Sequence, residues 1–141
     1  MLQEIIDRLK THASVLDEVR PAEDIEAITK GTAPRSGTVF VLPYRERAQP
    51  NQLSTGGFRQ LVVVQVLVAL VIRRHDDASG GKKAVLFDDA KTAIEAALAG
   101  WEPPSGEDAL SLVSAQAAPL GNGVTVYVQT WETSRFLEGN S

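Results

Sequence analysis

The residues of this chain that could do acid–base or metal chemistry are few and far apart. There are two histidines, His12 and His75, and no cysteine. Imidazole and thiolate are the usual ligands of transition metals, and imidazole is also the usual base near neutral pH. The carboxylate pairs Asp76-Asp77 and Asp88-Asp89 are adjacent in sequence, so their side chains diverge along any regular element. The local sequence therefore predicts neither a catalytic group nor a metal ligand, and we expect solvated side chains at these positions.

The segment Gly80-Gly81-Lys82-Lys83 is the nearest approach to a phosphate-binding loop. Such a loop needs an upstream glycine, where Asp76 stands, and a hydroxyl after the lysine, where Lys83 stands. We expect no cofactor and no enzyme activity from local motifs. A small-ligand-binding protein or an enzyme with a non-local site is a distant alternative, which would need polar groups such as Arg59, Gln60 and His75 to meet in a deep pocket.

Residues 58 to 74 contain the dominant apolar run, which must lie at the centre of the fold. From Leu61 to Ile72 every residue except Gln65 is apolar, and seven of these twelve residues are Val or Ile. Branched side chains are stiff in a helix and pack well on a pleated sheet. The run is also shorter than the ~20 apolar residues that span a bilayer. We therefore predict a long strand and no membrane segment.

The other elements follow from periodicity and from turn residues. We predict an α+β fold, with a mostly antiparallel sheet of about four to five strands that has a long central strand and packs against two to three helices. The predicted helices cover residues 2–12, 22–30 and 84–101, and the predicted strands lie near 15–19, 38–42, 60–72, 110–117 and 124–132. A chain of 141 residues fits one domain, residues 1–141. Flexible loops are expected at about 44–57 and 73–83, with a C-terminal tail at 137–141.

Composition restricts the class of partner and the compartment. The net charge is −4, whereas proteins that bind nucleic acid by neutralising phosphates need clustered Lys and Arg. Specific DNA binding is therefore not expected. The N-terminal residues do not form a secretory signal, and the absence of cysteine is compatible with a reducing cytoplasm.

The two long polar segments are the candidates for protein contact. Long loops in compact domains tend to be functional or disordered, and Tyr and Arg are enriched at interfaces. The hypothetical interface residues are Tyr44, Arg45, Arg47, Asn51 and Gln52 in the first segment and Arg73, Arg74, Lys82 and Lys83 in the second. We predict that deletion of residues 46–54 leaves the fold intact and abolishes association.

Several phrases along the chain resemble one protein family. They are Phe40-Val41-Leu42-Pro43, Asn51, Gly57-Phe58-Arg59-Gln60, Ala96-Ala97-Leu98-Ala99-Gly100-Trp101-Glu102-Pro103 and Val126-Tyr127-Val128-Gln129-Thr130-Trp131-Glu132-Thr133. Together they are similar to the phage tail-terminator-like proteins of Mu-like and related prophages. None of these phrases is a catalytic signature.

The resemblance implies a structural virion protein that acts as a ring, expected to be a hexamer. Such a ring caps the tail tube, ends polymerisation of the tail-tube protein and joins the tail to a head-completion or neck protein. DNA would pass through it without being specifically bound. The protein would be found in the bacterial cytoplasm during assembly and at the tail–neck junction of the virion. The nearest alternative is another head–tail joining or tail-completion protein.

Overall fold

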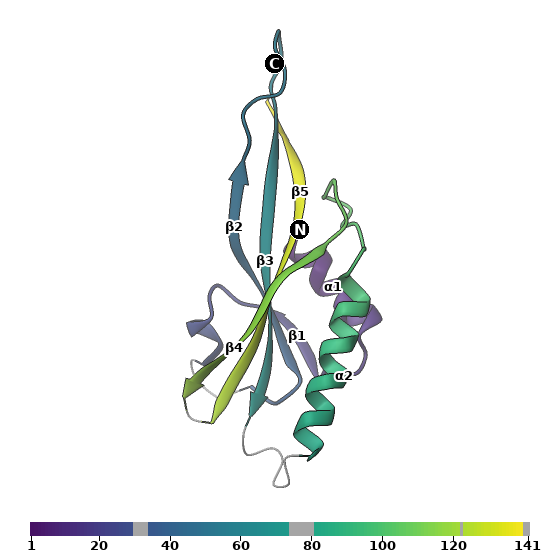
Figure 1. Ribbon diagram of the computed structural model, residues 1–141, viewed down its shortest axis with the longest axis vertical. Coiled ribbons are helices and arrows are strands. Elements are labelled where there is room, and N and C mark those ends of the chain that lie inside the picture. The colour runs from purple at the N-terminus through teal and green to yellow at the C-terminus, as the bar shows by residue number, and fades with distance from the viewer. Residues whose placement is uncertain (30–33, 74–80, 122, 140–141) are drawn as a thin grey trace.

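A computed structural model describes residues 1–29, 34–73, 81–121 and 123–139, with only the backbone of 29, 81–85 and 121 (Figure 1). The elements in chain order are α1 (Leu2–His12), β1 (Glu18–Pro21), the 3-10 turn η1 (Glu26–Thr29), β2 (Thr38–Ala48), β3 (Arg59–Arg73), α2 (Gly81–Leu98), β4 (Ser111–Gly121) and β5 (Val124–Glu138). The predicted α+β class is confirmed.

The strands form one five-stranded sheet in the order β1-β2-β3-β5-β4. β1 is parallel to β2, and the other neighbouring pairs are antiparallel. β3 is the central strand, as predicted, and its 15 residues pair with β5 from Arg59, opposite Glu138, to Arg73, opposite Val124. The sheet is therefore organised around the Val-rich run.

In the half of the sheet that is drawn at the bottom of Figure 1, both faces are covered, which explains why β3 carries apolar side chains on both faces there. The two helices lie on one face in Figure 1. On that face, α1 and α2 pack against alternate β3 residues, and the buried residues include Ile5, Ile6, Leu9, Val66, Val68, Leu70, Ile94, Leu98 and Trp131. On the opposite face, residues around η1 cover a second cluster that includes Ile28, Phe40, Leu42, Ala69, Val71 and Val126.

β2, β3 and β5 continue past the helices as a narrowing projection, which we call the arm (Figure 1). The arm comprises residues 44–65 and 132–139, including the connection between β2 and β3. It is a three-stranded antiparallel ribbon, because β1 and β4 do not extend along it. Its tip brings the β2–β3 connection beside the C-terminal residues, since the Gly139 N–H donates to the Phe58 carbonyl at 3.1 Å.

The predicted loop over residues 44–57 begins too early, because β2 continues through Pro43 to Ala48. A proline was expected to end this strand because it lacks an N–H donor. Here the parallel pairing of β1 with β2 ends at Val41, so Pro43 lies where β2 has one neighbour only. Its register also shifts between Pro43 and Arg45, and a bulge at a sheet edge tolerates proline.

Other predicted boundaries also change. Leu137 and Glu138 belong to β5 rather than to a tail at 137–141, because they pair with Gln60 and Arg59. The second predicted helix is the short turn η1. The predicted loop over 73–83 is shortened at both ends, because Arg73 is the last residue of β3 and α2 begins at Gly81. No helix in the described part of the chain is long and apolar enough to span a bilayer.

Candidate interaction surface

The hypothetical interface residues lie in two groups along β3. Tyr44, Arg45 and Arg47 are exposed residues of β2 beside the middle of β3, and Asn51 and Gln52 lie in the connection at its first end. Arg73 is the last residue of β3, about 26 Å along the strand from Gln65, the partner of Arg45, and about 45–50 Å from Arg59. Arg74 lies outside the described residues, and for Lys82 and Lys83 only the backbone in the first turn of α2 is described. Their role at an interface stays a prediction.

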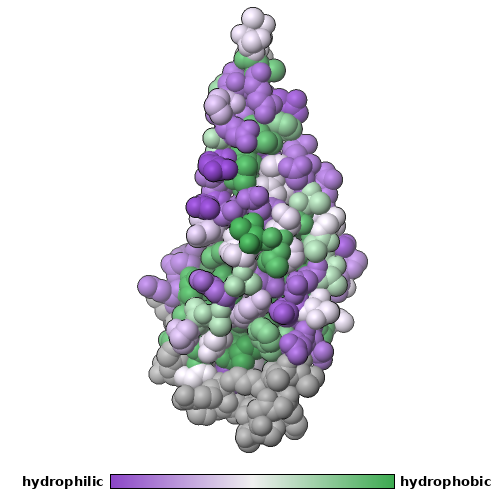
Figure 2. Space-filling model, in the orientation of Figure 1, coloured by the Kyte–Doolittle hydropathy of each residue, from purple (hydrophilic) through white to green (hydrophobic). Residues whose placement is uncertain are grey.

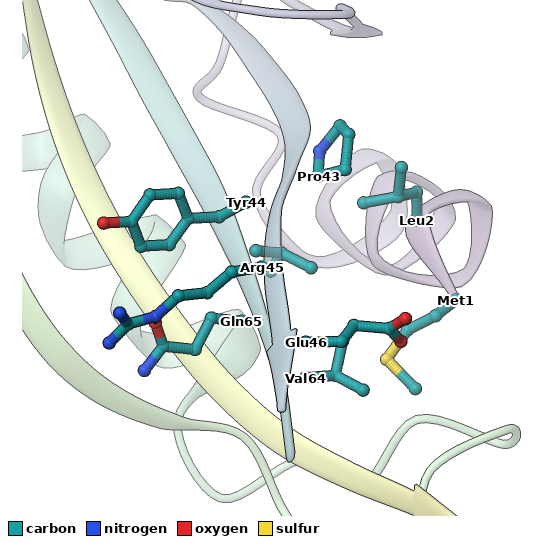
Figure 3. A pocket seen from close by; sticks show the side chains of 9 residues that line it. Met1, Leu2, Pro43, Tyr44, Arg45, Glu46, Val64 and Gln65 are labelled. Carbon is teal, nitrogen blue, oxygen red and sulfur yellow. The ribbon is translucent and has the colours of Figure 1, made fainter. Parts of the chain in front are cut away.

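β2 has a bulge at Tyr44. Pro43 is opposite Val66 and Arg45 is opposite Gln65, so Tyr44 is the extra residue. A bulge places two successive side chains on one side of a strand, and Tyr44 and Arg45 project to the same side in Figure 3. The Arg45 guanidinium carbon lies 5.4 Å from the centroid of the Tyr44 ring. Tyr44 remains 53% exposed, so the bulge presents an aromatic side chain at the sheet edge.

Arg45 is held by a row of polar groups across the arm. Its Nε donates to Gln65 Oε1 at 2.8 Å, and Gln65 Nε2 donates to Glu132 Oε1 at 2.9 Å. Arg45, Gln65 and Glu132 lie opposite one another on β2, β3 and β5. Gln65 is only 8% exposed, and an amide is the side chain that can both accept from the cation and donate to the carboxylate. This row explains the one polar residue in the apolar run.

An ion pair crosses the other face of the arm. Glu46 lies opposite Val64, and Arg135 lies opposite Val62. Arg135 Nε donates to Glu46 Oε1 at 3.0 Å, a contact made across β3, whose Val62 and Val64 are buried. The hydrogen bond from Arg135 is the main cause that lowers the pKa of Glu46 below its ordinary value. The pair therefore joins β2 to β5 where no helix covers the sheet.

The connection at the tip of the arm is ordered by Asn51. Its Oδ1 accepts from the backbone N–H of Leu53 at 3.2 Å and from that of Arg59 at 2.8 Å. The Gln52 N–H donates to the Arg59 carbonyl at 2.9 Å. Gly56 and Gly57 have φ of 59° and 79°, the left-handed region that glycine adopts without strain. Asn51 thus has a structural role in shaping the tip, which its position in a predicted loop did not reveal.

The predicted deletion of residues 46–54 would therefore remove more than a loop. Residues 46–48 belong to β2 and pair with Val64, Val63 and Val62. The deletion would also remove the Glu46–Arg135 ion pair. It would expose buried β3 side chains, so the expectation that the fold is left intact does not agree with the structure.

The surface around the bulge is hollowed (Figure 3). A depression of about 440 Å³ lies between the start of α1 and the base of the arm. It is lined by Met1, Leu2, Pro43, Tyr44, Arg45, Glu46, Val64, Gln65 and Val66. Apolar side chains with charged groups at the rim are typical of protein interfaces.

The structure also reveals a surface that the sequence analysis did not select, the outer edge of β4. β4 is the last strand of the sheet and pairs only with β5. Leu112 and Val113, beside a register shift between Leu112 and Ser114, are 44% and 49% exposed. Figure 2 shows a hydrophobic patch at mid-height, over the region that β4 crosses in Figure 1. The available signal was that residues 111–121 contain no charged side chain.

Groups that could do chemistry do not gather in the described part of the chain. No cluster of three or more His, Asp or Glu that could hold a metal ion occurs among the described residues. Arg59 is paired with Glu138 at 3.5 Å and lies 3.7 Å from the Phe136 ring centroid, and Gln60 Nε2 donates to the Gln49 carbonyl. His75 lies outside the described residues. The polar groups on the arm thus bind one another.

Comparison with known protein families shows which family the chain belongs to. A family model described as phage tail terminator protein matches residues 1–141. The chain belongs to the phage tail terminator family. The resemblance predicted from the Phe-Val-Leu-Pro and Leu-Ala-Gly-Trp-Glu-Pro phrases is therefore confirmed. No curated protein sequence matches this tail terminator family member.

The fold of this tail terminator family member is also found in a solved particle. One similar chain comes from the virion of a native gene transfer agent particle, with a TM-score of 0.61 and 17% sequence identity. The match covers 99% of this chain and 95% of that chain. At this identity the likeness establishes a shared fold over the whole length. Together with the family match, the chain is a structural tail-completion protein.

Proposed function

We propose that this protein forms a ring on the end of a completed tail tube, where it stops the addition of tail-tube subunits. The family match over residues 1–141 carries this proposal. The opposite face of the ring would bind a head-completion or neck protein, which joins the tail to the head. The ring is expected to be a hexamer, as the family resemblance implies. It would assemble in the bacterial cytoplasm and remain at the tail–neck junction of the virion.

The sheet topology supports a ring. The sheet ends on one side at β4 and on the other at β2 where β1 no longer covers it. Two different edges on one subunit suit heterologous contacts, in which one patch meets another patch on the next copy, and such contacts close into rings. A molecule with one self-complementary patch would instead favour a two-fold dimer.

The charge of the chain supports passage of DNA rather than binding. With a net charge of −4, each subunit repels phosphates at long range, so DNA could move through the ring without being retained. The polar groups of the row bind one another, and Glu46 and Arg135 bind each other on the other face. We therefore propose a structural role without catalysis.

The test is the solution mass of the purified protein, alone and after mixing with the tail-tube protein encoded beside it. Light scattering gives the mass, and electron microscopy shows whether tubes end in a cap and stop growing. We expect closed oligomers and tubes of fixed length that no longer incorporate added tube protein. A protein that neither oligomerises nor alters tube growth would contradict the terminator role, and binding to a neck protein alone would favour the head–tail joining alternative.

A further inference from the structure

The outer edge of β4 has no charged side chain and, over residues 111–117, no proline, although a bulge between Leu112 and Ser114 interrupts it. Edge strands are usually guarded by charged side chains or by proline, because unpaired N–H and C=O groups recruit other strands. Residues 111–121 contain no charged side chain, and their single proline, Pro119, stands near the far end. Residues 111–117 are exposed. Apart from the bulge between Leu112 and Ser114, residues 111–117 carry none of the usual hindrances to pairing with another strand.

A second unpaired edge lies on the opposite side of the same sheet. β1 pairs with β2 from Thr38 to Val41 only, so Leu42–Ala48 is paired with β3 alone. This free edge carries the bulge at Tyr44 and borders the 440 Å³ depression (Figure 3). The free segment of β2 is as long as the exposed segment of β4. The β4 edge is uncharged and carries the exposed Leu112 and Val113. The β2 edge carries Pro43 and three charged residues beside a hollow that is lined by both apolar and polar side chains.

Strand direction allows these two edges to meet in a ring. Because each neighbouring pair from β2 to β4 is antiparallel, β4 runs opposite to β2. When copies are related by rotation about one axis, β4 of one copy would therefore lie antiparallel to β2 of the next. This arrangement continues the sheet from subunit to subunit without reversing any chain.

The position of β1 sets the stagger between copies. Within one subunit, Ser111 lies in the same row as Glu132, Gln65 and Arg45. Because β1 occupies the edge up to Val41, residues 111–117 of the next copy must lie beside the segment that follows it. The shift must be an even number of residues, because side chains of paired strands keep to their faces, and a shift of four moves Ser111 from the row of Arg45 to about that of Gln49. This shift is about 13 Å along the strands across a width of about 19 Å, and the resulting strand tilt of about 34° is close to the 35–45° of closed sheets.

We infer that the ring contact is an antiparallel pairing of β4 residues 111–117 with residues 43–49 of a second copy, which are the free segment of β2 and the residue after it. Leu112 and Val113 would lie beside Arg47 and Ala48, and Gln116 and Ala117 beside Arg45 and Tyr44. The inference rests on the proposed ring and specifies its partner surface. A second copy is the occupant because both complementary edges, their directions and their lengths are present on one chain.

The test uses a chain without native cysteine, into which Arg47→Cys and Val113→Cys are introduced together. Within one subunit these positions are on opposite edges of the strands β2 to β4, at least about 14 Å apart, so a short bis-maleimide can join them only between copies. We expect a ladder of covalent multimers that ends at the ring. The matched control joins Val113→Cys with Val15→Cys, which replaces a similarly exposed valine between α1 and β1 and should give no ladder.

A second measurement does not depend on crosslinking. Val113→Lys should raise the protein concentration needed for half-maximal assembly by at least tenfold, because the contact would bury an unpaired charge. Val113→Thr and Val15→Lys should stay near the wild-type value, and circular dichroism checks that each variant folds.

The possible outcomes distinguish a failure of this contact from a failure of the proposed ring. Rings that form with no more crosslinking in the Arg47/Val113 pair than in the control overturn this contact and leave the proposed function standing. Crosslinks from position 113 to a tail-tube protein that carries an introduced surface cysteine, instead of to a second copy, assign the β4 edge to the tube and also overturn the contact. A protein that stays monomeric with the tube protein present overturns the ring and this contact together.

Discussion

Replacement of Gln65 by glutamate should make the stability of the arm depend on pH. Gln65 accepts from Arg45 at 2.8 Å and donates to Glu132 at 2.9 Å. Gln65→Glu keeps the size and the acceptor for Arg45 but replaces the donor by a carboxylate beside that of Glu132. Two carboxylates at this separation do not both ionise freely, so the pKa of the pair should rise above the ordinary value.

The structure bounds the size of this effect. A like charge at hydrogen-bond distance raises a carboxyl pKa by about 1–3 units, and each unit corresponds to about 1.4 kcal/mol. Arg45 is exposed and Glu132 is half-buried, so solvent screens part of the repulsion. We expect the free energy of unfolding to fall by about 1–2 kcal/mol at pH 7.

The sign of the pH dependence follows from linkage. The folded-state pKa of the carboxylate pair lies above the unfolded value of about 4.3, so the destabilisation is fully present above the folded pKa. It disappears as the pH falls below the unfolded value, because the protonated carboxyl then donates as the amide did.

The assay is urea unfolding followed by circular dichroism at pH 7 and pH 4, with Gln52→Glu in the exposed connection as the control. The control adds the same charge without a carboxylate neighbour in the row, so it should change stability by less than about 0.5 kcal/mol at either pH. Equal destabilisation of Gln65→Glu at both pH values would show that packing, rather than the polar row, governs this position.

Two further perturbations address the other contacts of the arm. Glu46→Gln should lower the free energy of unfolding at pH 7 by up to about 1 kcal/mol, since the side chains of Glu46 and Arg135 remain 49% and 34% exposed. Because the folded-state pKa of Glu46 is lowered, the stabilisation by the ion pair is present above the unfolded-state pKa and is lost as the pH falls through the folded-state pKa. In urea unfolding, the wild-type protein and the variant should therefore differ in stability at pH 7 and become similar at pH 3. The same difference at both pH values would contradict this. Asn51→Ala removes the acceptor of the Leu53 and Arg59 N–H groups, so we expect the free energy of unfolding to fall by about 1 kcal/mol and amide exchange at both residues to become faster. Asn51→Asp keeps an acceptor and should preserve their protection. Unchanged exchange in the alanine variant would refute the role of Asn51.

Much of the fold could be predicted because apolar periodicity records which face of each element is buried. The Val-rich run predicted β3, and an apolar stripe starting at Leu2 predicted α1. Ile5, Ile6 and Leu9 of this stripe are buried, as expected for an amphipathic helix. The extent of β2 was missed for a physical reason. A proline ends a strand that has two neighbours, but Pro43 lies where one neighbour has already ended, and sequence alone does not say where that happens.

The same limit applies to the candidate site. Tyr44, Arg45 and Arg47 were selected as loop residues and prove to be exposed strand residues. The bulge places Tyr44, and Gln65 holds Arg45. The nine residues were expected in two loops, one on each side of the long strand, and Arg45 and Arg47 instead lie beside the middle of that strand.

The edge of β4 was missed because alternation of polar and apolar residues reports the faces of a sheet and not its edges. Whether an uncharged strand such as 111–121 lies inside a sheet or at its margin depends on strand order, which is set by contacts distant in sequence. In the order β1-β2-β3-β5-β4, β4 lies at the margin of the sheet, and this position decides how its lack of charge is interpreted. Inside a sheet it would be ordinary, but at an exposed edge it leaves backbone groups unguarded. In the proposed ring, this edge would pair with the free segment of β2, which has a matching length and lies on the opposite side of the sheet.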